Sequence, residues 1–222
     1  DWQSSSEFWT ASKANRQINW DRLYYSNQQL AAQGKDAMYY IQAKNNDQLM
    51  LTLSSALKMD LTKNSSLNLG LNLQTTKGMH YQTMEDLLGA TVFHNINTYA
   101  LGTYAGSSNE VQYDLNNPNG EVREGDKFGY NYNLLVDKAN VWTTYKHDFN
   151  QIHTFLSGRV GATSMQRDGK MRNGLAVNNS YGKSGTARFL DGGVKAGATF
   201  SDGPYTMTWG VGYESRTPTA ST

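Results

Sequence analysis

A glycine–lysine–serine stretch is the first place in the sequence whose residue types could hold a phosphate. Gly182, Lys183 and Ser184 match the end of a phosphate-binding loop, in which backbone N–H groups and the lysine surround the phosphate oxygens. That loop also needs an earlier glycine, and the corresponding position holds Val177. We therefore expect Lys183 to lie in a surface loop between small residues.

The stretch from Asp114 to Gly120 carries oxygen-bearing side chains at spacings that resemble a calcium-binding loop. Pro118 stands where the third oxygen ligand is needed, and Gly125 stands where a glutamate closes such a site. A turn explains the composition better, because Asp, Asn, Pro and Gly dominate turns. Adventitious binding of a cation in this loop is the alternative.

The histidines do not form a recognisable zinc site. His147 and His153 straddle an expected tight turn at Asn150 and could face each other across a hairpin, but two imidazoles without a third ligand hold zinc poorly. His80 and His94 lie elsewhere, without the spacing of a metalloprotease helix. The chain has no cysteine. It also lacks a nucleophile elbow, in which a serine would be grouped with a histidine and an acidic residue. We expect no enzyme activity, no catalytic residue, no bound metal and no cofactor.

Composition limits the class of protein. A length of 222 residues fits one all-β domain. The 20 basic and 19 acidic residues nearly cancel, so no charge excess would attract nucleic acid. The mean hydropathy of −0.65 and the lack of a long apolar run exclude a helical membrane protein, but not a β-barrel, whose lumen face and loops are polar. Because the chain begins at Asp1 without a methionine or signal peptide, we expect it to be part of a longer protein.

Alternating leucines predict a long β-hairpin over residues 37–78. Apolar side chains take every second position on both sides of a turn at 62–66, so they share one face of the ribbon. That turn contains an Asn-Ser-Ser glycosylation pattern, for which turn formation is the better explanation. Each arm is as long as the roughly 9–11 tilted residues that cross a bilayer, whereas strands of soluble proteins average about 5–6. We expect the following side chains to face lipid: Leu49, Leu51, Leu53, Leu57, Leu67, Leu69, Leu71 and Leu73.

Two further hairpins are expected, over residues 127–163 and 186–216. In the first of them the alternation changes phase after Asp137-Lys138, which predicts either a bulge or a swap of the apolar side chains to the other face. The hairpins are separated by long polar stretches, the loops 1–35, 79–124 and 164–185. Short turns at one end and long loops at the other are typical of outer-membrane barrels.

The loops are expected to be partly helical. The sequence predicts helices near Trp20–Gln33, with Gly34 as its C-terminal stop, at Met84–Leu88 with Gly89 as its stop, and at Ile96–Tyr104. It also predicts that the first strand begins near Ala37 and that the second arm fades after Gly78.

Several segments resemble the barrel of TonB-dependent outer-membrane receptors of the Bacteroidetes type. The similarity is distributed over nearly the whole chain. It is carried by residues 126–132, 178–184, 189–195 and 213–218, and the segments 18–24 and 84–89 are similar to loops of the same family. The resemblance implies a large barrel with an N-terminal plug, which imports a scarce nutrient (siderophore, vitamin, glycan or peptide) with energy delivered by TonB.

We therefore expect an all-β fold, a partial antiparallel transmembrane β-barrel of about six long strands in three hairpins with long, partly helical extracellular loops. The plug and the remaining strands are then absent from this sequence. The implied partners are outer-membrane lipid, TonB through the plug, a surface lipoprotein and the imported small ligand. No binding residue follows from the family, and the loop aromatics give only weak ligand candidates: Trp20, Tyr24, Tyr25, Tyr99 and Tyr104.

The alternative is a soluble β-barrel or β-sandwich that binds a carbohydrate or an apolar ligand, with the leucines in its core. It predicts that the chain folds in water without detergent. A surface adhesin or structural barrel would share the strand pattern and lack a plug.

Overall fold

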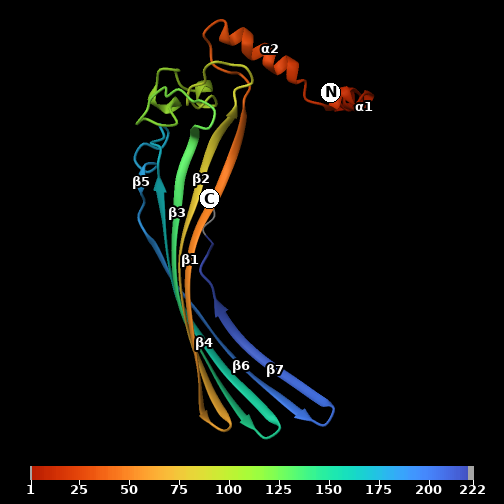
Figure 1. The fold of residues 1–222 in the computed structure, drawn as a ribbon, viewed down its shortest axis with the longest axis vertical. Coiled ribbons are helices and arrows are strands. Elements are labelled where there is room, and N and C mark those ends of the chain that lie inside the picture. The colour runs from red at the N-terminus through yellow and green to blue at the C-terminus, as the bar shows by residue number, and fades with distance from the viewer. Residues whose placement is uncertain (1, 220–222) are drawn as a thin grey trace. The chain divides into compact units, whose positions relative to one another are not determined.

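The computed structural model describes residues 2–219, and its main feature is an antiparallel sheet of seven strands. The order is β1-β2-β3-β4-β6-β7, with the short β5 paired to β4 (Figure 1). Within the described residues the sheet is not closed into a barrel, and β1 and β7 form its edges. The strands are β1 (Ile41–Thr62), β2 (Ser65–Asp86), β3 (Lys127–Phe149), β4 (Ile152–Gly169), β5 (Gly182–Lys183), β6 (Ala187–Asp202) and β7 (Tyr205–Ser215). The expected all-β fold with six long strands in three hairpins is confirmed.

The helices are short. They are α1 (Trp2–Ala11) and α2 (Trp20–Ala31), with three 3-10 turns, η1 (Ala14–Arg16), η2 (Ala100–Gly102) and η3 (Asn109–Val111). The helix expected near Trp20 is confirmed. The Asn19 side chain accepts a hydrogen bond from the Arg22 N–H at 3.0 Å, and Gly34, with φ of +66°, follows the helix. Neither α-helix in the described chain is long and apolar enough to cross a membrane.

The described residues divide into two compact units. The first consists of residues 2–44 and 81–130, and the second of residues 45–80 and 131–219. Strands β1, β2 and β3 contribute residues to both units. The two units differ in where their apolar side chains lie.

The first unit is built around a small aromatic core. The ring of Tyr40 lies 4.7 Å from that of Phe93 and 5.6 Å from that of Phe128. Ala37, Met84, Leu87 and Val122 complete the cluster. The loop that connects β2 to β3 supplies Phe93 and Val122 to this core, so the loop is packed against the strands.

Helix α2 is attached to this core through one buried amide. The side chain of Asn27 is fully buried, and its Nδ2 donates to the carbonyls of Tyr39 at 2.7 Å and Leu87 at 2.8 Å. Its Oδ1 accepts from the backbone N–H groups of Met38 and Tyr39 at 3.0 and 3.1 Å. Asn27 thus satisfies backbone groups of two segments that have no other regular pairing there.

Four expectations about strand ends and loop helices are wrong. Met84–Leu88 is not a helix, and the second arm does not fade at Gly78, because β2 continues to Asp86. Met84 is fully buried, so the strand is stabilised by core packing that the local sequence does not reveal. Leu88 and Gly89, with φ of +49° and +78°, then form a turn. The helix expected at Ile96–Tyr104 is reduced to η2, and β1 begins at Ile41, after Ala37.

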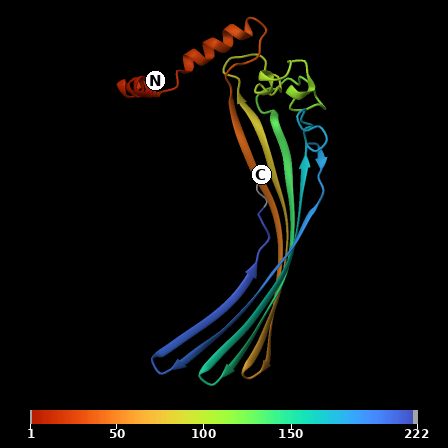
Figure 2. The same ribbon diagram turned by 180° about the vertical axis from the view of Figure 1, so that it is seen from behind.

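The second unit is a sheet whose three tight turns share one end. The turns between β1 and β2, between β3 and β4, and between β6 and β7 lie together, as both views show (Figures 1 and 2). Each turn comprises the residues between paired strands, at 63–64, 150–151 and 203–204. The predicted turn at Asn64-Ser65-Ser66 is confirmed at its start, although Ser65 already belongs to β2.

The phase change in β3 is a swap of faces without a bulge. Pairing between β3 and β4 runs without interruption from Tyr132 with Gly169 to Phe149 with Ile152. The backbone is therefore regular through Asp137, and the apolar side chains move from one face to the other only because the sequence pattern shifts by one position.

Candidate membrane-facing surface

The pairing of β3, β4, β6 and β7 assigns their side chains to two faces. Directly paired residues point to the same side of a sheet, and alternate residues point to opposite sides. One face, which we call the apolar face, carries mostly apolar side chains between the tight turns and the level of Asp137. Its members are Ala139, Val141, Tyr145 and Phe149 on β3, Ile152, Leu156, Val160 and Ala162 on β4, Leu190, Val194, Ala196, Ala198 and Phe200 on β6, and Tyr205, Met207, Trp209, Val211 and Tyr213 on β7.

The expected lipid-facing leucines extend this apolar face onto β2 and β1. A Cβ atom at Gly70 would meet the ring of Trp142, which lies on the face of the sheet opposite the apolar face. The leucines of β2 stand at odd-numbered positions, so alternation puts them on the apolar face. Likewise, Asn46 of β1 contacts His80 on the opposite face, and Leu49, Leu51 and Leu53 fall on the other side. Leu49, Leu51, Leu53, Leu57, Leu71 and Leu73 are exposed, whereas Leu67 and Leu69 are half-buried.

No apolar side chain of the second unit is buried in the described structure. The buried apolar residues all belong to the first unit: Ala37, Met84, Leu87, Leu88, Phe93, Ala100, Val111, Val122 and Phe128. In contrast, Leu190 is 82% exposed, Val211 76% and Val160 67%. The sheet has no hydrophobic core of its own, and its apolar face is larger than the scattered apolar residues of ordinary surfaces.

Polar side chains end the apolar face abruptly on four neighbouring strands. Thr75, Asp137, Ser164 and Arg188 lie on the same face, and we call them the boundary row. Thr75 Oγ1 donates to Asp137 Oδ1 at 2.7 Å, and Ser164 Oγ donates to Asp137 Oδ2 at 3.5 Å. In each of these strands an apolar residue, for example Ala139 or Leu190, lies two positions closer to the tight turn.

The apolar face has the height of a bilayer interior. On β4 it extends from Ile152 to Ala162. At about 3.3 Å per residue this stretch is about 33 Å long. For a strand tilted by about 40°, it covers about 25 Å along the membrane normal, which is the height of the apolar band in outer-membrane barrels.

The opposite face, which we call the polar face, carries an ion-pair cluster. Arg159 Nη1 lies 2.6 Å from Asp191 Oδ1, and its Nη2 lies 3.3 Å from Glu214 Oε1. Glu214 also pairs with Arg216 at 3.0 Å and with Lys195 at 3.9 Å. The Asp191 side chain is only 8% exposed, so its charge depends on Arg159 for compensation.

Glycines make room for this cluster on the sheet. A Cβ atom at Gly161 would lie 2.6 Å from Asp191 Oδ1 and 2.5 Å from Asn140 Oδ1. Both contacts are closer than real Cβ atoms tolerate, so the absence of a side chain at Gly161 lets the carboxylate and the amide approach the backbone. Sequence analysis missed this cluster. The sequence indicates the ion-pair cluster only through single charged residues that stand in strands that are otherwise mostly apolar.

A second polar arrangement crosses four strands on the polar face. The Arg167 guanidinium lies 4.8 Å from the centre of the Tyr132 ring, which stacks on His80 at 5.1 Å. His80 Nδ1 lies 2.7 Å from Asn46 Oδ1. Because this row contains a cation, two aromatic rings and an amide, the polar face is suited to contact with water or a polar ligand, and not with hydrocarbon.

The structure does not bring the five aromatic ligand candidates into one site. Trp20 lines a groove of about 510 Å³ in the first unit, together with Tyr39 and Tyr40. Tyr24 lies beside Asp86, to which its hydroxyl donates at 3.4 Å, and this carboxylate raises the pKa of Tyr24. Tyr25, Tyr99 and Tyr104 are exposed, and none of them lines the groove. Sequence analysis missed the groove residues Tyr39 and Tyr40, which lie just before the first strand.

The two histidines of the β3–β4 hairpin lie on opposite faces of the sheet. His147 and His153 do not meet: His147 pairs with Thr154 on the apolar face, and His153 lies on the other face with its Nδ1 2.8 Å from Asp148 Oδ1. Within the described residues no group of three or more possible metal ligands is found. Lys183 lies in the short strand β5 and not in a loop, which corrects that expectation.

The stretch from Asp114 to Gly120 forms the predicted turns. Asp114 Oδ1 accepts from the Asn116 N–H at 3.0 Å, and the carbonyl of Asn117 accepts from the Gly120 N–H at 3.2 Å.

The fold and these surfaces define a class: an antiparallel sheet with one exposed apolar face of bilayer height and one polar, ion-paired face. No protein-family model matches the chain, and no significant match is found among curated proteins.

Proposed function

We propose that this chain is part of the β-barrel of an outer-membrane receptor that imports a scarce nutrient with energy from TonB. The observation that carries the membrane part is the exposed apolar face, which ends at the boundary row and lies over a sheet without a buried apolar core. Hydrocarbon can cover such a face, whereas water would leave it as a large unfavourable surface.

The two strand ends also favour a membrane barrel. The tight turns at one end match periplasmic turns, and the stretches 87–126 and 170–186 that join the other ends match extracellular loops. The edges at β1 and β7 would pair with further strands of a complete barrel, because unpaired edges favour aggregation.

The transport part of the proposal rests on the distributed resemblance to TonB-dependent receptors. In this proposal the polar face lines the lumen and the packed loops of the first unit contribute to ligand capture. The imported ligand is a siderophore, vitamin, glycan or peptide, the plug connects the barrel to TonB, and no catalytic step is involved. A surface lipoprotein is a further partner of this proposal.

Cysteine labelling tests the membrane assignment, because the chain has no cysteine of its own. In Val211→Cys the thiol lies on the apolar face and in Thr208→Cys on the polar face of the same strand. In intact outer membranes we expect a small water-soluble thiol reagent to modify Thr208→Cys quickly and Val211→Cys only after detergent is added. Equal labelling of both positions, with protein that stays in solution without detergent, would favour the soluble alternative.

Uptake assays test the transport part separately. Cells that carry the complete receptor should accumulate one of the four ligand classes, and an uncoupler of the proton-motive force should stop the accumulation. If uptake of every class is unchanged by deletion of the receptor, the transport proposal fails even when the membrane assignment holds.

A further inference from the structure

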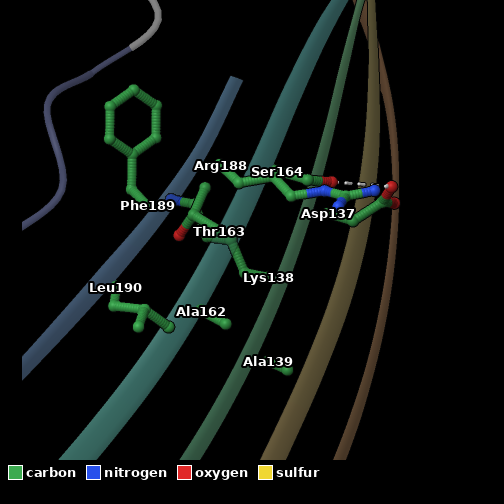
Figure 3. A pocket seen from close by; sticks show the side chains of 9 residues that line it. All are labelled: Asp137, Lys138, Ala139, Ala162, Thr163, Ser164, Arg188, Phe189 and Leu190. Atoms are coloured by element: carbon green, nitrogen blue, oxygen red, sulfur yellow. Dashed lines mark hydrogen bonds between the residues drawn. The ribbon is translucent and has the colours of Figure 1, made fainter. Parts of the chain in front are cut away.

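A pocket lies where β3, β4 and β6 cross the boundary row. It has a volume of about 610 Å³, within the range of small-molecule sites. Figure 3 shows the side chains that surround it, with Ala139, Ala162 and Leu190 on one side and Asp137, Ser164 and Arg188 on the other. The pocket therefore combines an apolar half, which belongs to the apolar face, with a polar half at the boundary row.

At the boundary row the pocket offers the cation of Arg188 and the fixed anion of Asp137, and a second cation, Lys138, also lines the pocket. Arg188 is exposed, and its guanidinium makes no hydrogen bond or ion pair with any residue between 2 and 219. Its side chain extends across β4 toward Asp137 (Figure 3). The Asp137 carboxylate accepts hydrogen bonds from Thr75 and Ser164, two neutral groups that hold it in place without cancelling its charge.

We propose that this pocket binds one lipid of the outer leaflet whose headgroup is a phosphorylated sugar; this inference rests on the proposed membrane function. The phosphate pairs with Arg188, because a guanidinium presents two parallel N–H donors that match phosphate oxygens. A sugar hydroxyl donates to Asp137, which as a carboxylate can only accept. An acyl chain lies along Ala139, Ala162 and Leu190 and covers the Leu190 side chain, which is 82% exposed.

The position of the pocket selects this kind of lipid. In the proposed orientation the tight turns face the periplasm, so the boundary row at the other end of the apolar face lies at the outer surface. Lipids there present phosphorylated sugars to the water. The pocket places its cation at the level of such headgroups and its apolar half at the level of the acyl chains, as cationic side chains do at membrane interfaces.

Native mass spectrometry of the complete receptor in detergent, supplied with monophosphoryl lipid A or its dephosphorylated form, tests the proposal. We expect the receptor to retain the phosphorylated lipid and Arg188→Gln to retain it about 10- to 100-fold less, the loss of one charge-assisted contact. Arg188→Lys should restore part of the binding. Lys183→Gln, which removes a charge on β5 outside the pocket, is the matched control and should bind as the unchanged receptor does.

Two results would overturn the lipid site. One is equal retention of the phosphorylated and dephosphorylated lipids, and the other is unchanged retention by Arg188→Gln. Competition by phosphatidylglycerol at equal concentration would show a site for any anionic lipid and would also reject the sugar-specific proposal. Labelling of Val211→Cys separates failure of the lipid site from failure of the membrane assignment. If Val211→Cys is protected in the membrane but lipid binding does not depend on Arg188, only the lipid site is rejected.

Discussion

An arginine placed at two depths of the apolar face tests the membrane assignment quantitatively. Leu156 and Val160 lie on the same face of β4 and are 57% and 67% exposed. Measured from Ala162 at the boundary, Leu156 lies about 20 Å along the strand and Val160 about 7 Å. With a tilt of about 40° these distances become depths of about 15 Å and about 5 Å, so Leu156 lies near the midplane and Val160 near the interface.

The expected costs follow from these depths. Leu156→Arg should lower the free energy of unfolding by about 2–4 kcal/mol, and Val160→Arg by about 0–1 kcal/mol, because an arginine near the interface reaches the headgroups and water. The complete receptor is refolded into vesicles, and urea unfolding is followed by tryptophan fluorescence. Thr208→Arg on the polar face serves as the control and should change stability little.

The soluble alternative gives a different pattern. If a second sheet or domain covered the apolar face, both leucine and valine would be core residues, and arginine would be severely destabilising at either position. Equal costs at the two depths would therefore refute the argument from strand geometry. A larger cost at Val160 than at Leu156 would refute it as well.

Three further predictions concern contacts elsewhere in the chain. Gly161→Ala should destabilise by about 1–3 kcal/mol in denaturant unfolding, because the new methyl group displaces Asp191 and Asn140, whereas Gly185→Ala, with open space around it, should not. Asn27→Ala should cost about 1–3 kcal/mol and expose the amides of Met38 and Tyr39 to hydrogen exchange, and unchanged protection there would contradict its anchoring role. Burial raises the pKa of Tyr40, with a smaller contribution from Tyr99, so its stabilising effect should be complete below the ordinary tyrosine pKa and be lost as the pH rises through the raised value. Ultraviolet titration of the wild type against Tyr40→Phe checks this, and a Tyr40 that ionises with the exposed tyrosines would contradict it.

Local patterns were enough to predict the three hairpins and the face assignment of the leucines. Period-two alternation depends only on residues two positions apart, and turn residues at 63–64 and 150–151 mark where strands reverse. The helix at Trp20 could also be predicted, since its cap at Asn19 and its stop at Gly34 are sequence-local signals. The same local logic failed at Met84, where a helical composition is overridden by burial against Phe93 and Phe128.

The sequence by itself determined that this chain forms long antiparallel strands with one apolar and one polar side. Only the tertiary structure decided which residues of different strands become neighbours: the boundary row around Asp137, the pairing of Arg159 with Asp191 and Glu214, and the pocket at Arg188. The reason is physical. Alternation is a property of one strand, whereas these sites depend on register across three or four strands, and a shift of one residue would move every partner to the opposite face.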